Sequence, residues 1–432
     1  MNLQTITTLA LLFIFLASGL WVSLGLFAVS IVALETFRTL PVEKLLAQNV
    51  WNTVTSTELL SLPLFILMAE ILFKTKLADQ MLRGLTPWAV LLPGRLVHIN
   101  VLACTLFATV SGSSAATTAT VGRITLSELL ERGYDRDLVT GSLAGAGTLG
   151  FLIPPSIVMI IYAVLAEVSL LKLFLAGVIP GLVMALGFMG YIAARALISP
   201  NRMPNERTSY TLRERLGALL HLLPVLGLMS LVLGTMYGGY ASPTEGAAIG
   251  VFGALLVSFA SGTATASNLS SAFARAARTS SMIGLIVAGA SFLALSMAYL
   301  GIPRAIAEAI SVLDLSPLGL IVLLVAFYVI LGFVLEGLAA LVLTLPITLP
   351  LVMAAGFDPI WFGVFVVITI ETAQITPPVG FNLFVIQGLT GDGIGAIAKN
   401  AFPFLCVMIA VAGLLVAFPG LALWLPEQIS FR

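Results

Sequence analysis

This 432-residue chain contains few charged residues, few cysteines and few histidines. Only 9% of its residues are charged, whereas soluble globular proteins carry about 25%, so the chain cannot cover a water-facing surface. Its formal net charge is zero, which gives nucleic-acid binding no support. Cys104 and Cys406 are too few for a disulfide framework. Both lie in apolar runs and are expected to be small buried residues.

The signatures of common enzyme classes are also missing from the sequence. There is no GxxxxGK(S/T) phosphate-binding loop, so the chain does not hydrolyse ATP by that route. Neither HExxH nor GxSxG occurs, and the two histidines, His98 and His221, are isolated. We therefore expect a protein that is not an enzyme.

Apolar residues are abundant, at 59%, and they come in long runs such as Leu9–Ala33, Leu143–Leu165 and Ala401–Leu425. A membrane-spanning helix needs about 20 mostly apolar residues, so the chain has room for roughly ten to twelve passes. We expect a multi-pass membrane protein. The first residues lack a basic n-region and are expected to form a retained span, although residues 5–34 could make one long span or two short ones.

One polar segment, 195–215, separates two apolar halves of similar size. We predict that residues 1–194 and 216–432 form two repeats and that 195–215 is a cytoplasmic linker. Each half contains a predicted re-entrant hairpin, over 97–120 and over 318–355. Placing most Lys and Arg residues in the cytoplasm makes the two hairpins enter from opposite sides, as expected for an inverted-topology repeat.

The first hairpin tip consists of small residues, SGSS at Ser111–Ser114, and the second, GFVLEG, begins and ends with glycine at Gly332 and Gly337. Each hairpin is followed by a helix with a double proline, predicted over 137–166 and 360–388. Ile153 follows Ser111 by 42 residues, and Thr376 follows Gly332 by 44. Such matching positions in the two halves favour a repeat over two unrelated helix kinks or packing patches.

A double proline has a defined effect on a helix. It removes N–H donors and forces the preceding residue out of the helical region, so several carbonyl groups lose their helical partners. In the membrane this is tolerated where the carbonyls line a cavity or bind a cation. The new helix N-termini favour an anionic ligand. Among the intramembrane acids, Glu336 and Glu371 lie near these features, whereas Glu70 and Glu245 are near span ends.

At these residues the sequence resembles the large membrane subunit of the tripartite ATP-independent periplasmic (TRAP) transporters. The resemblance covers nearly the whole chain and is strongest in the following stretches: PLFILMAEIL (63–72), HINVLACTLFATVSGSSAATTATVG (98–122), GTLGFLIPPSIVMIIY (147–162), LFLAGVIPG (173–181), ASPTEGAAIG (241–250), LPITLPLVMAAGFDPIWFGV (345–364) and ITPPVGFNLFV (375–385).

The resemblance implies an all-α polytopic protein of the bacterial inner membrane that belongs to the ion transporter superfamily, with two inverted repeats and an elevator mechanism. It implies Na⁺-driven uptake of an organic acid, usually a carboxylate. It also implies two partners, a periplasmic substrate-binding protein and a small four-span membrane subunit. Because the chain begins at the large subunit's first span, the small subunit is expected to be a separate polypeptide.

The resemblance also assigns two Na⁺ sites. The ligands carried over to the first site are Ser111, Ser114, Gly150, Ile153 and Pro155, and those carried over to the second are Gly332, Ala373, Thr376 and Val379. The residues that could contact the substrate are Ser113, Pro154, Ser156, Glu336, Pro377, Pro378 and Gly380. The family often has Asp where this chain has Glu336, and Gly where it has Ala373, so the second site departs from the family pattern at two positions.

Two alternatives remain open from the sequence. A stand-alone Na⁺/dicarboxylate symporter of the same superfamily would share the hairpins and breaks but would need no binding protein. A membrane enzyme or receptor is a different class, and the missing catalytic residues argue against it.

Overall fold

The computed structural model describes residues 3–200, 204, 210–311, 315–333, 335–378 and 380–429. Within these ranges every regular element is a helix. The first half contains α1 (Leu3–Ala17), α2 (Val22–Phe37), α3 (Val42–Val54), α4 (Thr57–Leu72), α5 (Leu77–Ala89), the short 3₁₀ helix η1 (Arg95–Val97), α6 (His98–Ser111), α7 (Ser114–Glu131), α8 (Arg136–Gly147), α9 (Leu149–Leu152), α10 (Ile157–Ala166) and α11 (Leu170–Ile198).

The second half also consists of helices, and their lengths range from 8 residues in α12 to 35 in α15. It contains α12 (Leu212–Leu219), α13 (Leu223–Tyr237), α14 (Pro243–Ala260), α15 (Ala266–Leu300), α16 (Ile302–Ser311), α17 (Pro317–Leu331), α18 (Gly337–Ala354), α19 (Pro359–Gln374), α20 (Phe381–Thr390), α21 (Ile394–Ala417) and α22 (Gly420–Gln428).

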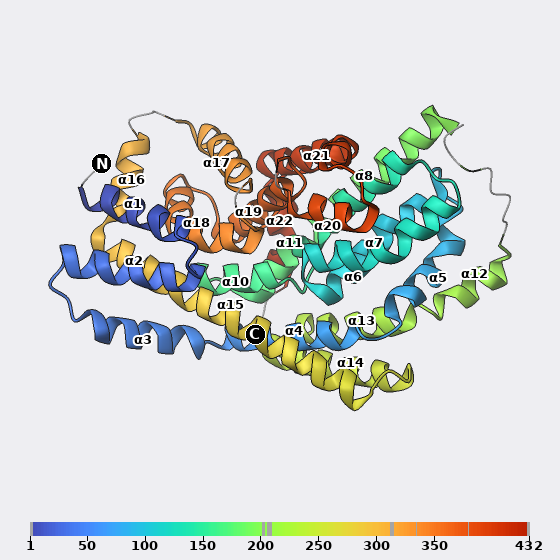
Figure 1. The fold of residues 1–432 in the computed structure, drawn as a ribbon, viewed down its shortest axis with the longest axis horizontal. Helices are drawn as coiled ribbons and strands as arrows, with labels where there is room; N and C mark the ends of the chain where they lie inside the picture. Colours follow the sequence, from blue (N-terminus) through green and yellow to red (C-terminus); the bar gives the residue numbers. More distant parts are fainter. Residues whose placement is uncertain are drawn as a thin grey trace.

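The helices form two layers along the long axis of the molecule. Helices α3, α4, α13 and α14 line one long side, while α8, α17 and α21 line the other (Figure 1). In the first layer α4 packs against α14 and α15, and in the second α21 packs against α8, α11 and α19. Helix α15 runs diagonally through the molecule and contacts α2, α4 and α18. The two layers therefore meet along α4, α10 and α15.

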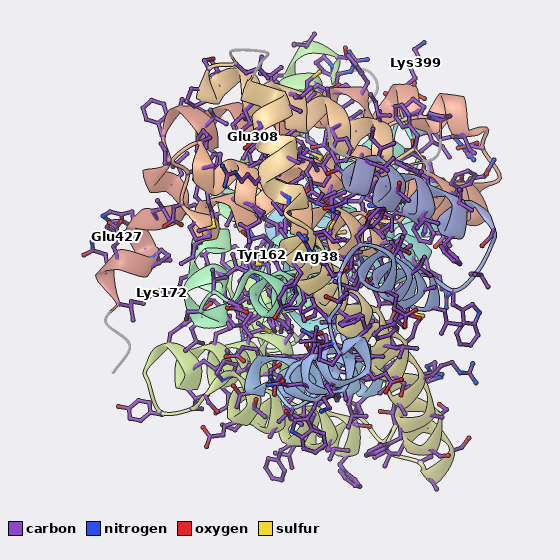
Figure 2. All side chains as sticks on the ribbon, turned by 90° about the vertical axis from the view of Figure 1, so that its left-hand side faces the viewer. Arg38, Tyr162, Lys172, Glu308, Lys399 and Glu427 are labelled. Carbon is purple, nitrogen blue, oxygen red and sulfur yellow. The ribbon has the colours of Figure 1, made fainter. Side chains whose placement is uncertain are left out.

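The exterior of the bundle is apolar, as a lipid environment requires. Leu186 and Phe252, on helices α11 and α14, are 66% and 63% exposed, respectively. Large apolar side chains also fill the interior, where Tyr162 is completely buried. Figure 2 places Tyr162 inside the bundle and Lys399 and Glu427 at its edge. Because so much apolar surface is exposed, the fold matches a bilayer better than water.

Six of the described helices are long and apolar enough to cross a membrane, or up to eight if each strongly bent pair counts as one span. This is fewer than the ten to twelve passes expected from the apolar runs. The difference arises because several runs fold as pairs of shorter helices. Residues 3–37, for example, form α1 and α2 instead of one long span, and the run Leu216–Met236 is broken between α12 and α13, which meet at 50°.

Both predicted hairpins and both broken helices are present. The first hairpin consists of α6 and α7 and the second of α17 and α18, with their tips at the predicted residues. The first broken helix is interrupted between α9 and α10, and the second between α19 and α20. One boundary was wrong: the first hairpin does not end at residue 120, because α7 continues as a helix to Glu131.

The two cysteines and the two acids near span ends have different environments. Cys104 is buried as expected, but Cys406 is exposed, because it lies on the outer face of α21. Glu70 forms an ion pair with Arg275 at 2.6 Å. Glu245 caps the start of α14, where its carboxylate accepts hydrogen bonds from the N–H and hydroxyl of Ser242. Both acids thus have structural roles.

Candidate functional site

The first hairpin tip turns sharply and lies directly against the first helix break. Helix α6 ends at Ser111, and Gly112 then adopts a left-handed backbone with φ +58°. A side chain on Gly112 would lie 3.0 Å from the carbonyl oxygen of Pro155. The N–H of Ile157 donates to the carbonyl of Gly112 at 3.3 Å. Glycine is therefore required here both for the turn and for the close approach.

Gly150 provides the second contact between tip and break. A Cβ atom on Gly150 would lie 2.6 Å from the carbonyl oxygen of Ser113 and 2.7 Å from the backbone nitrogen of Ser114. Within the tip, the Ser111 hydroxyl hydrogen-bonds to the Thr117 hydroxyl at 2.6 Å. The structure thus brings the tip serines and the first break together, as the sequence predicted.

Ile153 opens the break. Its N–H still completes the helix by donating to the Leu149 carbonyl at 3.0 Å, and its own backbone is extended. Pro154 and Pro155 follow, joined by a cis peptide bond, and Ser156 then caps α10 by accepting from the N–H of Met159 at 3.3 Å.

The hydroxyl of Ser114 reaches beyond its own half of the chain. It lies 3.1 Å from the carbonyl oxygen of Gly147, 3.0 Å from Oε2 of Glu371 and 2.8 Å from Nδ2 of Asn382. Ser114, Glu371 and Asn382 are all buried. Sequence reasoning noted Glu371 without giving it a partner and missed Asn382, although Asn382 lies two residues after Gly380 in the stretch ITPPVGFNLFV.

The second hairpin tip approaches the second break in the same manner. A Cβ atom on Gly332 would overlap the Cβ of Ala373, and one on Gly337 would meet Ile370, Gln374 and Phe151. Phe151 belongs to the first break, so the second tip contacts both breaks. In Figure 1 the two hairpins lie toward opposite ends of the molecule, with α10, α11 and α20 between them.

The oxygens predicted for the second site are partly engaged. The carbonyl of Ala373 accepts from the N–H of Thr376 at 3.2 Å, and the carbonyl of Thr376 accepts from the N–H of Gly380 at 3.1 Å. The Thr376 hydroxyl donates to the Thr372 carbonyl at 2.7 Å. Each carbonyl keeps a second lone pair for a ligand. The remaining predicted ligand, Val379, lies outside the described residues.

The candidate substrate contacts fall into two groups. In the first half, Pro154 and Ser156 are buried, and Ser113 caps α7 by accepting from the N–H of Ala116 at 3.4 Å. In the second half the residues are more accessible: Glu336, Pro377 and Pro378 are exposed, and Gly380 is buried. Glu336 caps α18 by accepting from the N–H of Leu338 at 3.2 Å. The peptide bond between Pro377 and Pro378 is also cis.

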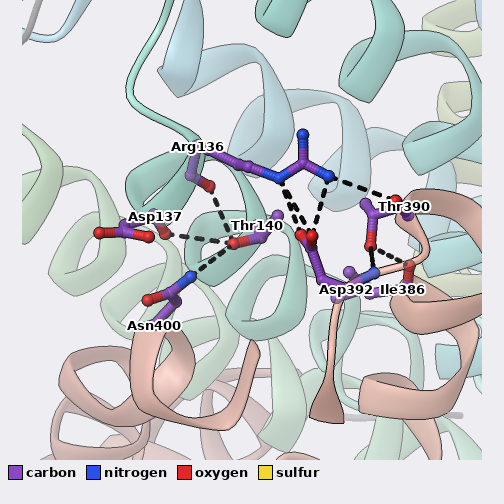
Figure 3. Close-up of polar contacts among 7 residues, drawn as sticks. All are labelled: Arg136, Asp137, Thr140, Ile386, Thr390, Asp392 and Asn400. Atoms are coloured by element: carbon purple, nitrogen blue, oxygen red, sulfur yellow. Dashed lines mark hydrogen bonds and ion pairs between the residues drawn. The ribbon is translucent and has the colours of Figure 1, made fainter. Parts of the chain in front are cut away.

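A polar link between the halves lies at the far end of α8. Arg136 donates from Nη2 and Nε to the carboxylate of Asp392, each at 2.9 Å, and also to the carbonyl of Thr390 (Figure 3). Beside it, Asn400 donates to the Thr140 hydroxyl at 3.1 Å. These contacts connect the start of α8 to the end of α20, to Asp392 and to α21.

We expect Arg136→Ala to lower the free energy of unfolding by less than about 1 kcal/mol, because the pair is largely exposed. The Arg136 side chain is 50% exposed and that of Asp392 26%. Thermal unfolding of the purified protein measures the effect, and Arg304→Ala, which breaks a more exposed ion pair with Glu308, is the matched control. A loss of more than about 3 kcal/mol, the scale of a broken buried pair, would contradict this expectation.

With this geometry established, comparison with known proteins shows the family. Residues 9–421 match the model of the "Tripartite ATP-independent periplasmic transporter, DctM component". The chain belongs to this family. As a TRAP large permease it is a multi-pass membrane protein of a bacterial solute importer and not an enzyme.

Individual relatives agree with the family match. The C4-dicarboxylate TRAP transporter large permease protein DctM of Pseudomonas aeruginosa is 35% identical over 388 residues, covering 89% of this chain and 90% of the relative. The isethionate TRAP transporter permease protein DctMQ of Oleidesulfovibrio alaskensis is 30% identical over 417 residues, covering 95% of this chain and 64% of that longer protein.

A solved structure supports the fold of this TRAP permease. The YdaH transporter of Alcanivorax borkumensis superposes with a TM-score of 0.65 at 15% sequence identity, covering 89% of this chain and 88% of that one. The all-helical membrane fold predicted from the sequence, with its hairpins and broken helices, is thereby confirmed.

Proposed function

We propose that this TRAP permease imports an organic acid by coupling its movement to Na⁺. The observation that carries the proposal is the close contact of each hairpin tip with a helix break, which glycine permits at Gly150 in the first half and at Gly332 in the second. Hydroxyl and carbonyl oxygens gather at both contacts. Such hard oxygen ligands suit a cation like Na⁺, and the helix N-termini beyond the breaks suit an anionic group.

The ligand sets fit Na⁺ better than a transition metal. Among the described residues no group of three or more His, Cys, Asp or Glu side chains could hold a metal ion. In the first set the Ser114 hydroxyl is buried beside the break, and in the second the carbonyls of Ala373 and Thr376 have lone pairs to spare. Na⁺ is here the transported coupling ion and not a resident cofactor.

The two-layer arrangement supports an elevator mechanism. The hairpins and broken helices would form the moving part, and α2–α4 with α13–α15 would form the support. A polar cavity of about 490 Å³ lies where these parts meet. Asn52, Thr53 and Glu58 line it from the support, and Glu167 and Ser169 from the segment after α10. A cavity at this boundary would open and close as the moving part travels.

A TRAP system implies a small permease subunit and a periplasmic binding protein as partners. We propose that the small subunit has four spans and that the binding protein delivers the solute. The relatives named above are a C4-dicarboxylate transporter and an isethionate transporter. One carries a carboxylate and the other a sulfonate by name, which supports a small organic anion as the substrate class.

The test is uptake by proteoliposomes that contain the permease, the small subunit and the binding protein loaded with the solute that co-purifies with it. We expect accumulation only when Na⁺ is higher outside, and none when choline replaces Na⁺. Accumulation that does not depend on the Na⁺ gradient would reject Na⁺ coupling. Uptake without the binding protein would instead indicate the stand-alone symporter.

A further inference from the structure

A cluster of four buried groups joins the two halves at the first hairpin tip. Its centre is the Ser114 hydroxyl, on α7. Around it lie the Gly147 carbonyl from α8, the Glu371 carboxylate from α19 and the Asn382 amide from α20. Glu371 is 1% exposed and Asn382 is not exposed at all. The cluster therefore belongs to both halves. By contrast, the ligands that the resemblance assigns to the first Na⁺ site, which include Ser114, all lie in the first half.

The hydrogen bonds in this cluster do not satisfy its oxygen atoms. The Ser114 hydroxyl has one proton, so it can donate either to Gly147 or to Glu371 but not to both. Asn382 uses its N–H on Ser114. In the described part of the chain, Oε1 of Glu371 and Oδ1 of Asn382 have no hydrogen-bond partner. Buried acceptors without partners are rare in folded proteins and call for an explanation such as a bound ion.

The charge of Glu371 is equally unbalanced. Within the described residues its carboxylate forms no ion pair, unlike those of Glu70, Glu128, Glu308 and Asp392. An isolated ionised carboxylate is strongly unfavourable in a buried, apolar setting. Intramembrane acids of this kind mark ion pathways. A cation bound by oxygen ligands would balance such a charge.

We propose that Glu371 and Asn382 bind Na⁺ together with Ser114, so that one coupling site is shared between the two halves. The inference rests on the proposed function, since it takes Na⁺ as the coupled ion. The carboxylate neutralises the ion, and the two unpartnered oxygens and the Gly147 carbonyl complete its shell. Ion binding thereby fastens α19 and α20 to the first hairpin tip. The loaded site has no net charge when it crosses the membrane.

Na⁺-dependent thermal unfolding of the purified full chain tests the proposal without any transport. NaCl is titrated against choline chloride at constant ionic strength. We expect Na⁺ to raise the midpoint temperature of the natural protein in a saturable way, because a ligand that binds only the folded state stabilises it. In Glu371→Gln, the Na⁺ concentration for half-maximal stabilisation should rise at least about tenfold, as expected when a buried charged partner is lost.

A matched control and the Na⁺-free state separate this role from a structural one. Without Na⁺, Glu371→Gln should be at least as stable as the natural protein, because the amide keeps the shape and removes the buried charge. Glu128→Gln, an exposed acid on α7, should leave the Na⁺ response unchanged. A Glu371→Gln variant that is destabilised equally at all Na⁺ concentrations would overturn the proposal.

Asn382→Ala provides a second route, which does not depend on the folding of the Glu371 variant. It removes one oxygen ligand and should also shift the Na⁺ response to higher concentration. Both variants could be stabilised half-maximally at the same Na⁺ concentration as the natural protein while uptake remains Na⁺-driven. In that case the shared site is wrong and the proposed function stands. If uptake by the natural protein is independent of Na⁺, the proposed function itself fails.

Discussion

Solute uptake should fall at least about 100-fold when Gly150 is replaced with alanine. The added methyl group causes overpacking of about 3 kcal/mol, and the protein can relieve it only by moving the hairpin tip away from the helix break. The new Cβ would meet backbone atoms of Ser113 and Ser114 at 2.6–2.7 Å. A flexible side chain could move away from such a contact, but backbone held in a tight turn cannot. Uptake per folded molecule in proteoliposomes measures the effect.

Gly190→Ala is the control for Gly150→Ala. Gly190 lies on α11, and a Cβ there would meet nothing within 4 Å. The change should leave uptake within about twofold and could slightly stabilise the helix, since alanine is the better helix former. Near-normal uptake by a folded Gly150→Ala protein would show that the tip and the break need not touch during transport.

The second large effect is expected at Gly332. In Gly332→Ala the added methyl group overlaps the methyl group of Ala373, and we expect uptake to fall at least about 30-fold, the equivalent of about 2 kcal/mol of overpacking. Ala373→Gly removes the opposing methyl group. The double variant should therefore recover to within about threefold of Ala373→Gly alone, because the other atoms near this Cβ lie at 3.3–3.4 Å.

Recovery in the double variant is the informative result, because it shows that the two residues interact directly. Gly388→Ala, on α20 with no atom within 4 Å of the added Cβ, controls for a general effect of alanine in this half. Losses in the two single variants that simply add in the double variant would argue against a contact between Gly332 and Ala373 during transport.

Much of the fold was predictable because membrane proteins have few options. Long apolar runs must become helices, because a helix pairs its backbone N–H and C=O groups within a single segment and lipid offers no hydrogen-bond partners. Pro154–Pro155 and Pro377–Pro378 had to interrupt their helices, and both do. The small residues of each tip marked a turn near each break. The predicted boundaries of the second hairpin, 318–355, differ from the structure by a single residue at each end.

Other features could not be predicted, for identifiable reasons. The apolar character of a run does not reveal where the run bends. The sequence therefore did not decide whether the N-terminal run forms one helix or two, and it did not predict the bend between α12 and α13. The first hairpin was predicted to end at residue 120, yet α7 continues to Glu131. The exposure of Cys406 depends on which face of α21 is packed, and that depends on its neighbours.

The sequence by itself determined that this chain lies in a membrane, that each half has a hairpin and a broken helix, and that small residues stand where the backbone turns. These are local properties, set by hydrophobicity and by the geometry of glycine and proline. Only the tertiary structure decided that Ser114 meets Glu371 and Asn382, because these residues lie more than 250 positions apart. No local rule brings a buried carboxylate to a hydroxyl in the other half; the packing of α7 against α20 and of α9 against α19 does.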